Sequence, residues 1–285
     1  MFLQPASLSA AIDLLARHGG ILLAGGTDYF PTLGQSVEVR PIIDISRLPE
    51  LTVITAEPED IRIGAGVTWS EIAAAPLPSA FDGLKAAARE IGSIQIQNRG
   101  TIGGNLCNAS PAADSVPPLL TLDARVEIAS SDRKRELPLD AFIRGNRRTA
   151  LEPGEIVTAV LIPRRHGDLA SHFVKLGTRR YMVISIAMIA VALCRAADGA
   201  IAEARIAAGA CSAVAQRLTE IENTLVGCRS VTDIAAAVTP GRLAQLAPID
   251  DVRATAAYRR DAAATLIRRA VQDCFAKTGG VLIDA

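Results

Sequence analysis

The sequence is poor in aromatic residues and carries no excess of charge, and both features exclude classes of function. Aromatic side chains make up 4% of the 285 residues, which argues against a surface that stacks nucleic-acid bases. The formal net charge is +0, so the composition provides no general attraction for nucleic acid or for an anionic membrane. We therefore expect no nucleic acid and no membrane among the partners.

Cysteine and histidine are also sparse. The five cysteines occur singly, none with the C-x-x-C spacing of metal and cluster sites, and there are three histidines, so we expect no metal site in this chain. Such a dispersed set is typical of reduced thiols. No basic segment leads into an apolar stretch at the N-terminus, and the longest apolar run, residues 181–193, is shorter than the ~20 residues that span a bilayer. These features predict a cytoplasmic protein, with residues 181–193 as a buried strand.

Three common motifs of nucleotide binding and hydrolysis are missing. No G-x-G-x-x-G opens a helix, and neither G-x-x-x-x-G-K-[ST] nor G-x-S-x-G occurs. A bound dinucleotide would therefore lie outside the Rossmann and P-loop designs, and a hydrolytic triad has little basis.

The order of apolar patterns predicts an α+β protein. Helical periodicity is found at residues 7–17, 69–75, 83–91, 231–246 and 258–276. Strands are predicted at residues 21–24, 41–45, 119–128, 155–162, 171–176, 185–193 and 201–208, with a hairpin pairing 51–54 and 61–63. The strands at residues 171–176, 185–193 and 201–208 suggest an antiparallel meander. Strands and helices in mixed order favour α+β over regular βαβ alternation, and the charged residues 164–168 suggest a domain boundary.

The first motif that can carry chemistry is the run Ala24, Gly25, Gly26, Thr27 and Asp28, directly after an apolar strand. Two glycines let the backbone turn sharply and approach a ligand without hindrance from a Cβ atom. The N–H groups of such a turn form a concavity that binds anions, and the threonine adds a hydroxyl. This chemistry suits a diphosphate. The alternative is a plain Gly-Gly turn between a strand and a loop.

A second, denser motif lies within residues 100–114, a polar stretch without periodicity that we predict to be a loop. It contains Thr101, Ile102, Gly103, Gly104 and Asn105, and Asp114 follows at short range. The paired glycines again admit a ligand, while a carboxylate can accept hydrogen bonds from ribityl or ribose hydroxyls. The alternative is an ordinary polar loop with a solvated aspartate, but a loop of this length within a compact protein favours function.

Together the two motifs and the aspartate resemble the signature of the medium, FAD-binding subunits of molybdenum hydroxylases, the xanthine dehydrogenase and carbon monoxide dehydrogenase family. The likeness covers nearly the whole chain. It implies a two-part FAD-binding domain of the vanillyl-alcohol-oxidase (PCMH) kind at residues 1–168, with subdomains at about 1–55 and 56–168. A C-terminal domain of antiparallel sheet and helices would occupy residues 169–285.

The resemblance also implies which residues hold FAD. The first loop (Ala24 to Asp28) and the second (Thr101 to Asn105) would wrap the diphosphate, and Asp114 would hold FAD hydroxyls. Lys175 matches a lysine near the flavin in xanthine dehydrogenases; its alternative is a solvated lysine that ends a strand. Arg179 and Arg180 are either solvated or interface residues, or flavin contacts. No catalytic residue and no metal ligand is expected in the chain.

The family further implies an electron-relay function. A separate large subunit would hold molybdopterin and hydroxylate the substrate, and a small subunit would carry two [2Fe-2S] clusters, in a heterotrimer or its dimer. FAD in this chain would collect electrons and pass them to NAD or another acceptor. The similarity of residues 105–108 and 113–115 to bacterial xanthine dehydrogenase subunits implies a purine or another N-heterocycle as the substrate of the complex. Two alternatives stay open: a self-contained FAD-dependent reductase or oxidase on the same scaffold, and a non-catalytic assembly module.

Overall fold

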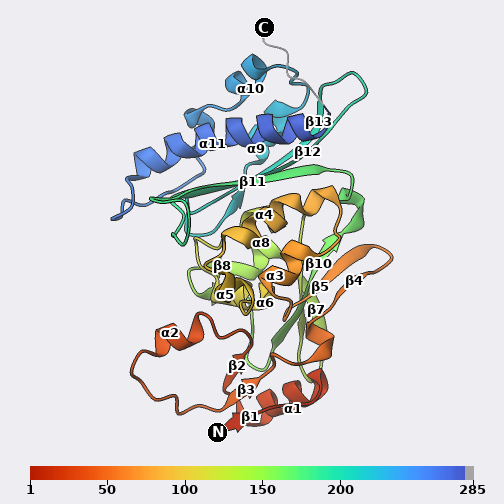
Figure 1. Ribbon diagram of the computed structural model, residues 1–285, viewed down its shortest axis with the longest axis vertical. Coiled ribbons are helices and arrows are strands. Elements are labelled where there is room, and N and C mark those ends of the chain that lie inside the picture. Colours follow the sequence, from red (N-terminus) through yellow and green to blue (C-terminus); the bar gives the residue numbers. More distant parts are fainter. Residues whose placement is uncertain (280–285) are drawn as a thin grey trace. The chain divides into compact units, whose positions relative to one another are not determined.

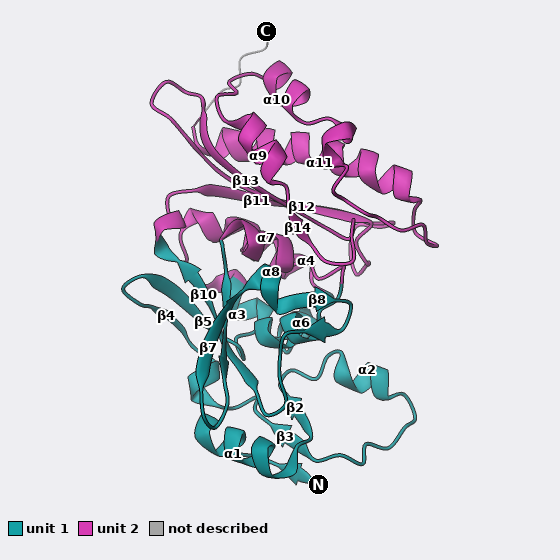
Figure 2. Cartoon of the chain, turned by 180° about the vertical axis from the view of Figure 1, so that it is seen from behind, with its two compact units in different colours: residues 1–72, 92–110, 123–164 teal, residues 73–91, 111–122, 165–285 magenta. Residues whose placement is uncertain are grey.

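The structure is a computed structural model that describes residues 1–279. They form two compact units whose segments interleave along the chain (Figure 2). Unit 1 comprises Met1–Ile72, Gly92–Ser110 and Asp123–Arg164, and unit 2 comprises Ala73–Ile91, Pro111–Leu122 and the chain from Arg165 onward. Both units combine helices with sheet, which confirms the predicted α+β class.

Unit 1 contains three sheets and short helices (Figure 1). Its strands are β1 (Phe2–Leu3), β2 (Ile21–Leu23), β3 (Ile42–Asp44), β4 (Ile54–Ala56), β5 (Asp60–Gly64), β6 (Arg125–Ala129), β7 (Lys134–Pro138), β8 (Ile143–Gly145), β9 (Arg148–Thr149) and β10 (Ile156–Pro163). Its helices are α1 (Leu8–His18), α2 (Tyr29–Leu33), the 3-10 helix η1 (Pro49–Leu51), α3 (Trp69–Ala74, which runs into unit 2), α5 (Ile94–Gln97), α6 (Ile102–Asn108) and α8 (Leu139–Phe142).

The parallel sheet β1-β3-β2 positions the first glycine loop. Helix α1 begins at the N-cap Ser7, whose hydroxyl accepts a hydrogen bond from Ala10 N, and its apolar face packs into the core that also contains Ile43 of β3. Strand β2 then ends at Leu23, and the loop follows directly. The predicted amphipathic helix and the two predicted strands of this region are confirmed.

The five-stranded sheet has the order β4-β5-β10-β6-β7, with antiparallel pairing throughout. The predicted strand 155–162 is the central strand β10, and all eight residues of β10 are buried. The predicted hairpin of residues 51–54 and 61–63 is present, but its first strand begins later than predicted. Ile54 pairs with Ile63, whereas Leu51 belongs to η1.

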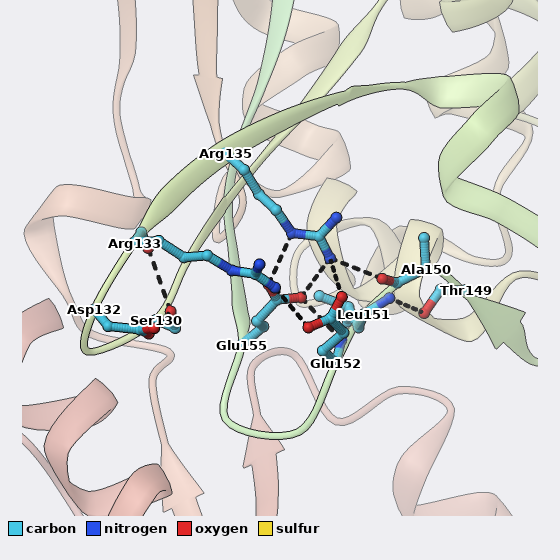
Figure 3. Close-up of polar contacts among 9 residues, drawn as sticks. All are labelled: Ser130, Asp132, Arg133, Arg135, Thr149, Ala150, Leu151, Glu152 and Glu155. Carbon is cyan, nitrogen blue, oxygen red and sulfur yellow. Dashed lines mark hydrogen bonds and ion pairs between the residues drawn. The ribbon is translucent and has the colours of Figure 1, made fainter.

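An ion network closes one end of this sheet (Figure 3). The carboxylate of Glu155, 5% exposed, accepts hydrogen bonds from the Arg135 guanidinium at 2.8 and 2.6 Å and from Arg133 at 3.0 Å. Its backbone neighbour Glu152 donates an N–H to the same carboxylate at 2.8 Å and pairs with Arg133 through its own side chain. The network therefore ties β7 to the turn that precedes β10.

Unit 2 is built on one four-stranded sheet of order β11-β12-β13-β14. Its strands are β11 (Ala170–Leu176), β12 (Ala187–Arg195), β13 (Ile201–Gly209) and β14 (Gln216–Arg217). Its helices are η2 (Ser79–Phe81), α4 (Asp82–Glu90), α7 (Val116–Thr121), η3 (Arg164–His166, at the boundary of the units), α9 (Thr219–Leu225), α10 (Val231–Ala237), η4 (Pro240–Leu243) and α11 (Ala256–Lys277).

Both faces of this sheet are covered. From β12, Ile189 and Val191 point into the core formed with α9 and α11, whereas Met188 and Ala190 point to the opposite face, where Ala87 of α4 packs. A strand buried on both faces reads as a continuous apolar run. The antiparallel meander and the long last helix are confirmed.

Four local predictions are wrong. Residues 119–121 belong to helix α7, whose start is favoured by prolines in its first turn, and strand β6 begins only at Arg125. The predicted helix 231–246 ends at Ala237, because Pro240 starts a separate 3-10 helix. Residues 181–186 are outside the buried strand, with Tyr181 61% exposed. The predicted loop 100–114 contains α6.

Candidate functional site

The two glycine motifs meet in unit 1. A Cβ atom built on Gly25 would lie 1.9 Å from the carbonyl oxygen of Arg99, directly before the second motif. One built on Gly100 would lie 3.3 Å from the Thr27 hydroxyl. Gly26 has φ +71°, in the region that favours glycine. The first pair of glycines is therefore required by close packing between the motifs and by the turn itself.

The second motif is the beginning of a helix. Thr101 is the N-cap of α6, and its hydroxyl accepts the N–H of Gly104 at 3.1 Å. Ile102 N donates to Val67 O at 3.0 Å, and Gly103 N donates to Ala65 O at 2.9 Å. Glycines are poor helix formers, which is why the pattern predicted a loop; the N-cap and these long-range hydrogen bonds fix the helix instead.

The two motifs present different surfaces to a ligand. Within residues 1–279, the N–H groups of Gly25, Gly26, Thr27 and Asp28 have no protein acceptor. Gly104 is exposed, and apart from the backbone of its own helix a Cβ built on it would meet the Thr101 hydroxyl, at 2.9 Å, among the described residues. The first motif therefore offers free donors to an anion, while the second offers an open surface for close approach at Gly104.

Asp114 and Lys175 form a buried ion pair in unit 2. The Lys175 ammonium lies 2.6 Å from Asp114 Oδ2, and the two side chains are 8% and 6% exposed. Lys175 comes from β11, and Asp114 lies just before α7. The alternative of a solvated lysine is wrong, and so is that of a solvated aspartate. Whether these residues contact FAD stays a prediction.

Ser185 completes this cluster, and no sequence motif points to it. Its hydroxyl, in a side chain only 2% exposed, donates to Asp114 Oδ1 at 2.6 Å. Burial raises the pKa of Asp114 above its ordinary value, and the charge of Lys175 and the hydrogen bonds from Lys175 and Ser185 oppose that rise. A lone serine before a strand carries no sequence signal, so only the fold reveals this contact.

A cavity of about 370 Å³ lies beside Lys175, within unit 2, and is also lined by Glu90, Phe173, Arg179 and Arg180. Its volume is within the range of small-molecule sites. The Arg179 guanidinium donates to the carbonyl of Met182 at 2.5 and 3.2 Å, and Arg180 lies 5.2 Å from the ring centroid of Tyr181. The cavity thus combines cationic and apolar walls.

The chain matches two families of known proteins. Residues 1–165 match the family described as "FAD binding domain in molybdopterin dehydrogenase", and residues 172–274 match the "CO dehydrogenase flavoprotein C-terminal domain". The chain therefore belongs to the FAD-binding subunits of molybdenum-hydroxylase-type dehydrogenases. It is a flavoprotein component of an oxidoreductase. The predicted domain boundary at residue 168 stays a prediction.

Similar proteins span the chain almost end to end. The xanthine dehydrogenase FAD-binding subunit of Escherichia coli O157:H7 is 33% identical over 98% of this chain and 97% of its own length. The nicotine 6-hydroxylase medium subunit of Paenarthrobacter nicotinovorans is 31% identical over 97% and 98%. Among solved structures, quinoline 2-oxidoreductase from Pseudomonas putida 86 superposes with a TM-score of 0.88 at 27% identity, covering 97% of each chain.

Among the helices of residues 1–279, none has the length and apolar character needed to cross a membrane.

Proposed function

We propose that this chain holds FAD as the electron-transfer subunit of a multi-subunit molybdenum hydroxylase. With FAD bound, the chain would receive electrons from the [2Fe-2S] clusters of a small partner subunit and deliver them to NAD or another acceptor. A large partner subunit binds molybdopterin and oxidises the substrate. The observation that carries this proposal is the row of four amides at Gly25 to Asp28 that have no acceptor among the described residues. This row packs against the second motif, in a chain of this family.

The residues of the two motifs fit a dinucleotide diphosphate. The free amides of the first motif supply donors for phosphate oxygens, and Gly104 leaves room for the ligand to approach the backbone. FAD, when bound, supplies the ability to exchange both single electrons and electron pairs. This chain's own part is to bind and orient the cofactor, and no acid–base residue of the chain is assigned a step in substrate oxidation.

We propose that Asp114 and Lys175, which belong to unit 2, are also FAD-binding residues. Lys175 supplies a fixed positive charge, held by the carboxylate at 2.6 Å, and Ser185 fixes the other oxygen of that carboxylate. A preorganised charge needs little reorganisation when the cofactor charge changes.

We further propose that the complex is a heterotrimer or a dimer of heterotrimers and that it is cytoplasmic. Its substrate would be a purine or another N-heterocycle. Three similar proteins carry names that refer to xanthine, nicotine and quinoline, all N-heterocycles. In this proposal the large subunit holds the substrate pocket. The identity of the substrate is therefore tested on the assembled complex.

The test is co-expression of this chain with its large and small partners, followed by anaerobic reduction with xanthine, nicotinate or quinoline. The expected result is iron–sulfur bleaching followed by flavin bleaching, and reoxidation by NAD or by an artificial acceptor. A chain that retains no FAD would contradict the cofactor assignment. Turnover of a small organic substrate by the isolated chain would instead favour the self-contained flavoenzyme.

A further inference from the structure

Arg147 occupies a backbone conformation that does not suit arginine. It lies in the turn between β8 and β9 with φ +54°. This left-handed region favours glycine, and among other residues asparagine and aspartate. A residue held there by its surroundings stores conformational strain, and such positions cluster at ligand-binding sites. The strain therefore calls for an explanation in terms of what the side chain does.

The backbone of Arg147 is anchored to the helix of the second motif. Its N–H donates to the carbonyl oxygen of Ala109 at 3.2 Å. Ala109 is the C-cap of α6, itself with φ +47°. The turn is thus joined to the helix that carries Gly104 at its other end.

The side chain of Arg147 reaches the first motif. Its guanidinium nitrogen Nη2 lies 3.5 Å from Asp28 Oδ2, and the two side chains are 59% and 53% exposed. An ion pair so exposed contributes little to stability, so the pair alone does not account for an arginine at a strained position.

A ligand explains the pair better. Asp28 is the last of the four residues with unpaired amides, and its carboxylate would repel a diphosphate bound there. A cation beside it offsets that repulsion. The planar guanidinium has five donors, enough to pair with a carboxylate and a phosphate oxygen at once.

We propose that Arg147 is a phosphate-binding residue of the dinucleotide site, which bridges Asp28 and the FAD diphosphate. The inference rests on the proposed function, since it requires FAD at the two motifs. It adds a third segment, the β8–β9 turn, to that site.

The decisive variant is Arg147→Gly, because glycine adopts φ +54° without strain. Removal of the cation is thereby separated from damage to the fold, and the melting temperature should be unchanged or higher. The Kd of the full-length chain for FAD should rise roughly 10-fold, a change of about 1.4 kcal/mol. The Kd for ADP, measured by competition, should rise by a similar factor because ADP shares the diphosphate. The Kd of Arg147→Lys for FAD should lie between the values of the parent chain and of Arg147→Gly.

Arg144 is an exposed arginine of β8 in the same hairpin. The matched control is therefore Arg144→Gln, which should bind FAD like the parent chain. Arg147→Asn is a second variant that tolerates the left-handed conformation. An unchanged FAD affinity in Arg147→Gly and Arg147→Asn would overturn the inference, as would a loss that affects FAD but not ADP. Failure of the unaltered chain to bind any FAD would contradict the proposed function itself.

Discussion

The ammonium of Lys175 and the carboxylate of Asp114 lie 2.6 Å apart with both side chains buried, although 61 positions separate them in the sequence. Ser185 holds the second carboxylate oxygen. The charged pair is therefore built into unit 2 by its own fold, and a cofactor that faces it meets a charge already in place.

The pair should behave as one unit in stability measurements. Removing one partner leaves a buried charge without its counter-ion, so Asp114→Asn and Lys175→Met should each lower the free energy of unfolding by about 3–5 kcal/mol. The double variant should lose less than the sum of the two single losses. Chemical denaturation measures the free energy of unfolding of the parent chain, the two single variants and the double variant. Strictly additive losses would show that the two residues do not interact.

Gly104 should be essential for flavin retention but dispensable for folding. A Cβ atom on Gly104 would lie 2.9 Å from the Thr101 hydroxyl, so this N-cap must shift, and the side chain of Gly104→Val fills the surface that the ligand needs. We expect the purified variant to lose FAD but still to fold, with a loss of about 1 kcal/mol from the disturbed cap. Flavin content by absorbance and the melting curve test this. Gly241→Val, where the nearest atom would lie 4.0 Å from a Cβ, is the control; normal FAD content in Gly104→Val would refute the assignment.

The Glu155 network should make stability depend on pH in the acid range. Hydrogen bonds from Arg135, followed by the Glu152 N–H and Arg133, lower the pKa of Glu155 from 4.5 to about 2, against the opposing effect of burial. A carboxylate with a lowered folded-state pKa stabilises the fold above its unfolded value, and that contribution is lost as the pH falls from about 4.5 toward 2.

Melting temperatures between pH 7 and pH 2 test this expectation. The parent chain should lose stability more steeply than Glu155→Gln within that acid window, and the two should run parallel above it. Parallel curves throughout the acid range would mean that Glu155 has an ordinary pKa in the folded chain.

Among the arginines of the last helix, Arg259 should contribute to the folding stability of unit 2. It is 3% exposed, and its guanidinium donates to the carbonyls of Ile186 at 2.6 Å and Ala210 at 3.2 Å and to Asp251 at 2.6 Å. Arg259→Met leaves the carbonyls of Ile186 and Ala210 without this donor, whereas the Asp251 carboxylate keeps its hydrogen bonds from Arg253 and from the Ala254 N–H. The substitution should destabilise the chain by about 1–3 kcal/mol for each buried carbonyl.

Arg269→Met is the matched control, because Arg269 is exposed on the same helix. It should change the free energy of unfolding by no more than about 0.5 kcal/mol. Equal effects of the two substitutions in urea denaturation would contradict the structural role of Arg259.

The sequence predicted those elements whose pattern repeats over many residues. The last helix, α11, is confirmed because its apolar positions recur with the helical period, and in the meander of β11, β12 and β13 the central strand is a continuous apolar run. Short apolar or glycine-rich stretches were ambiguous. The helices α6 and α7 were read as loop and strand, since six or seven residues contain too little periodicity to distinguish the two.

By itself, the sequence determined the fold class and the two glycine motifs, because turn chemistry and periodicity depend on neighbouring residues. Tertiary structure alone decided that Gly25 packs against Arg99, that Lys175 is buried against Asp114 and that Arg147 reaches Asp28. Contacts between residues so far apart in the chain depend on how strands and helices pack, which no local pattern encodes.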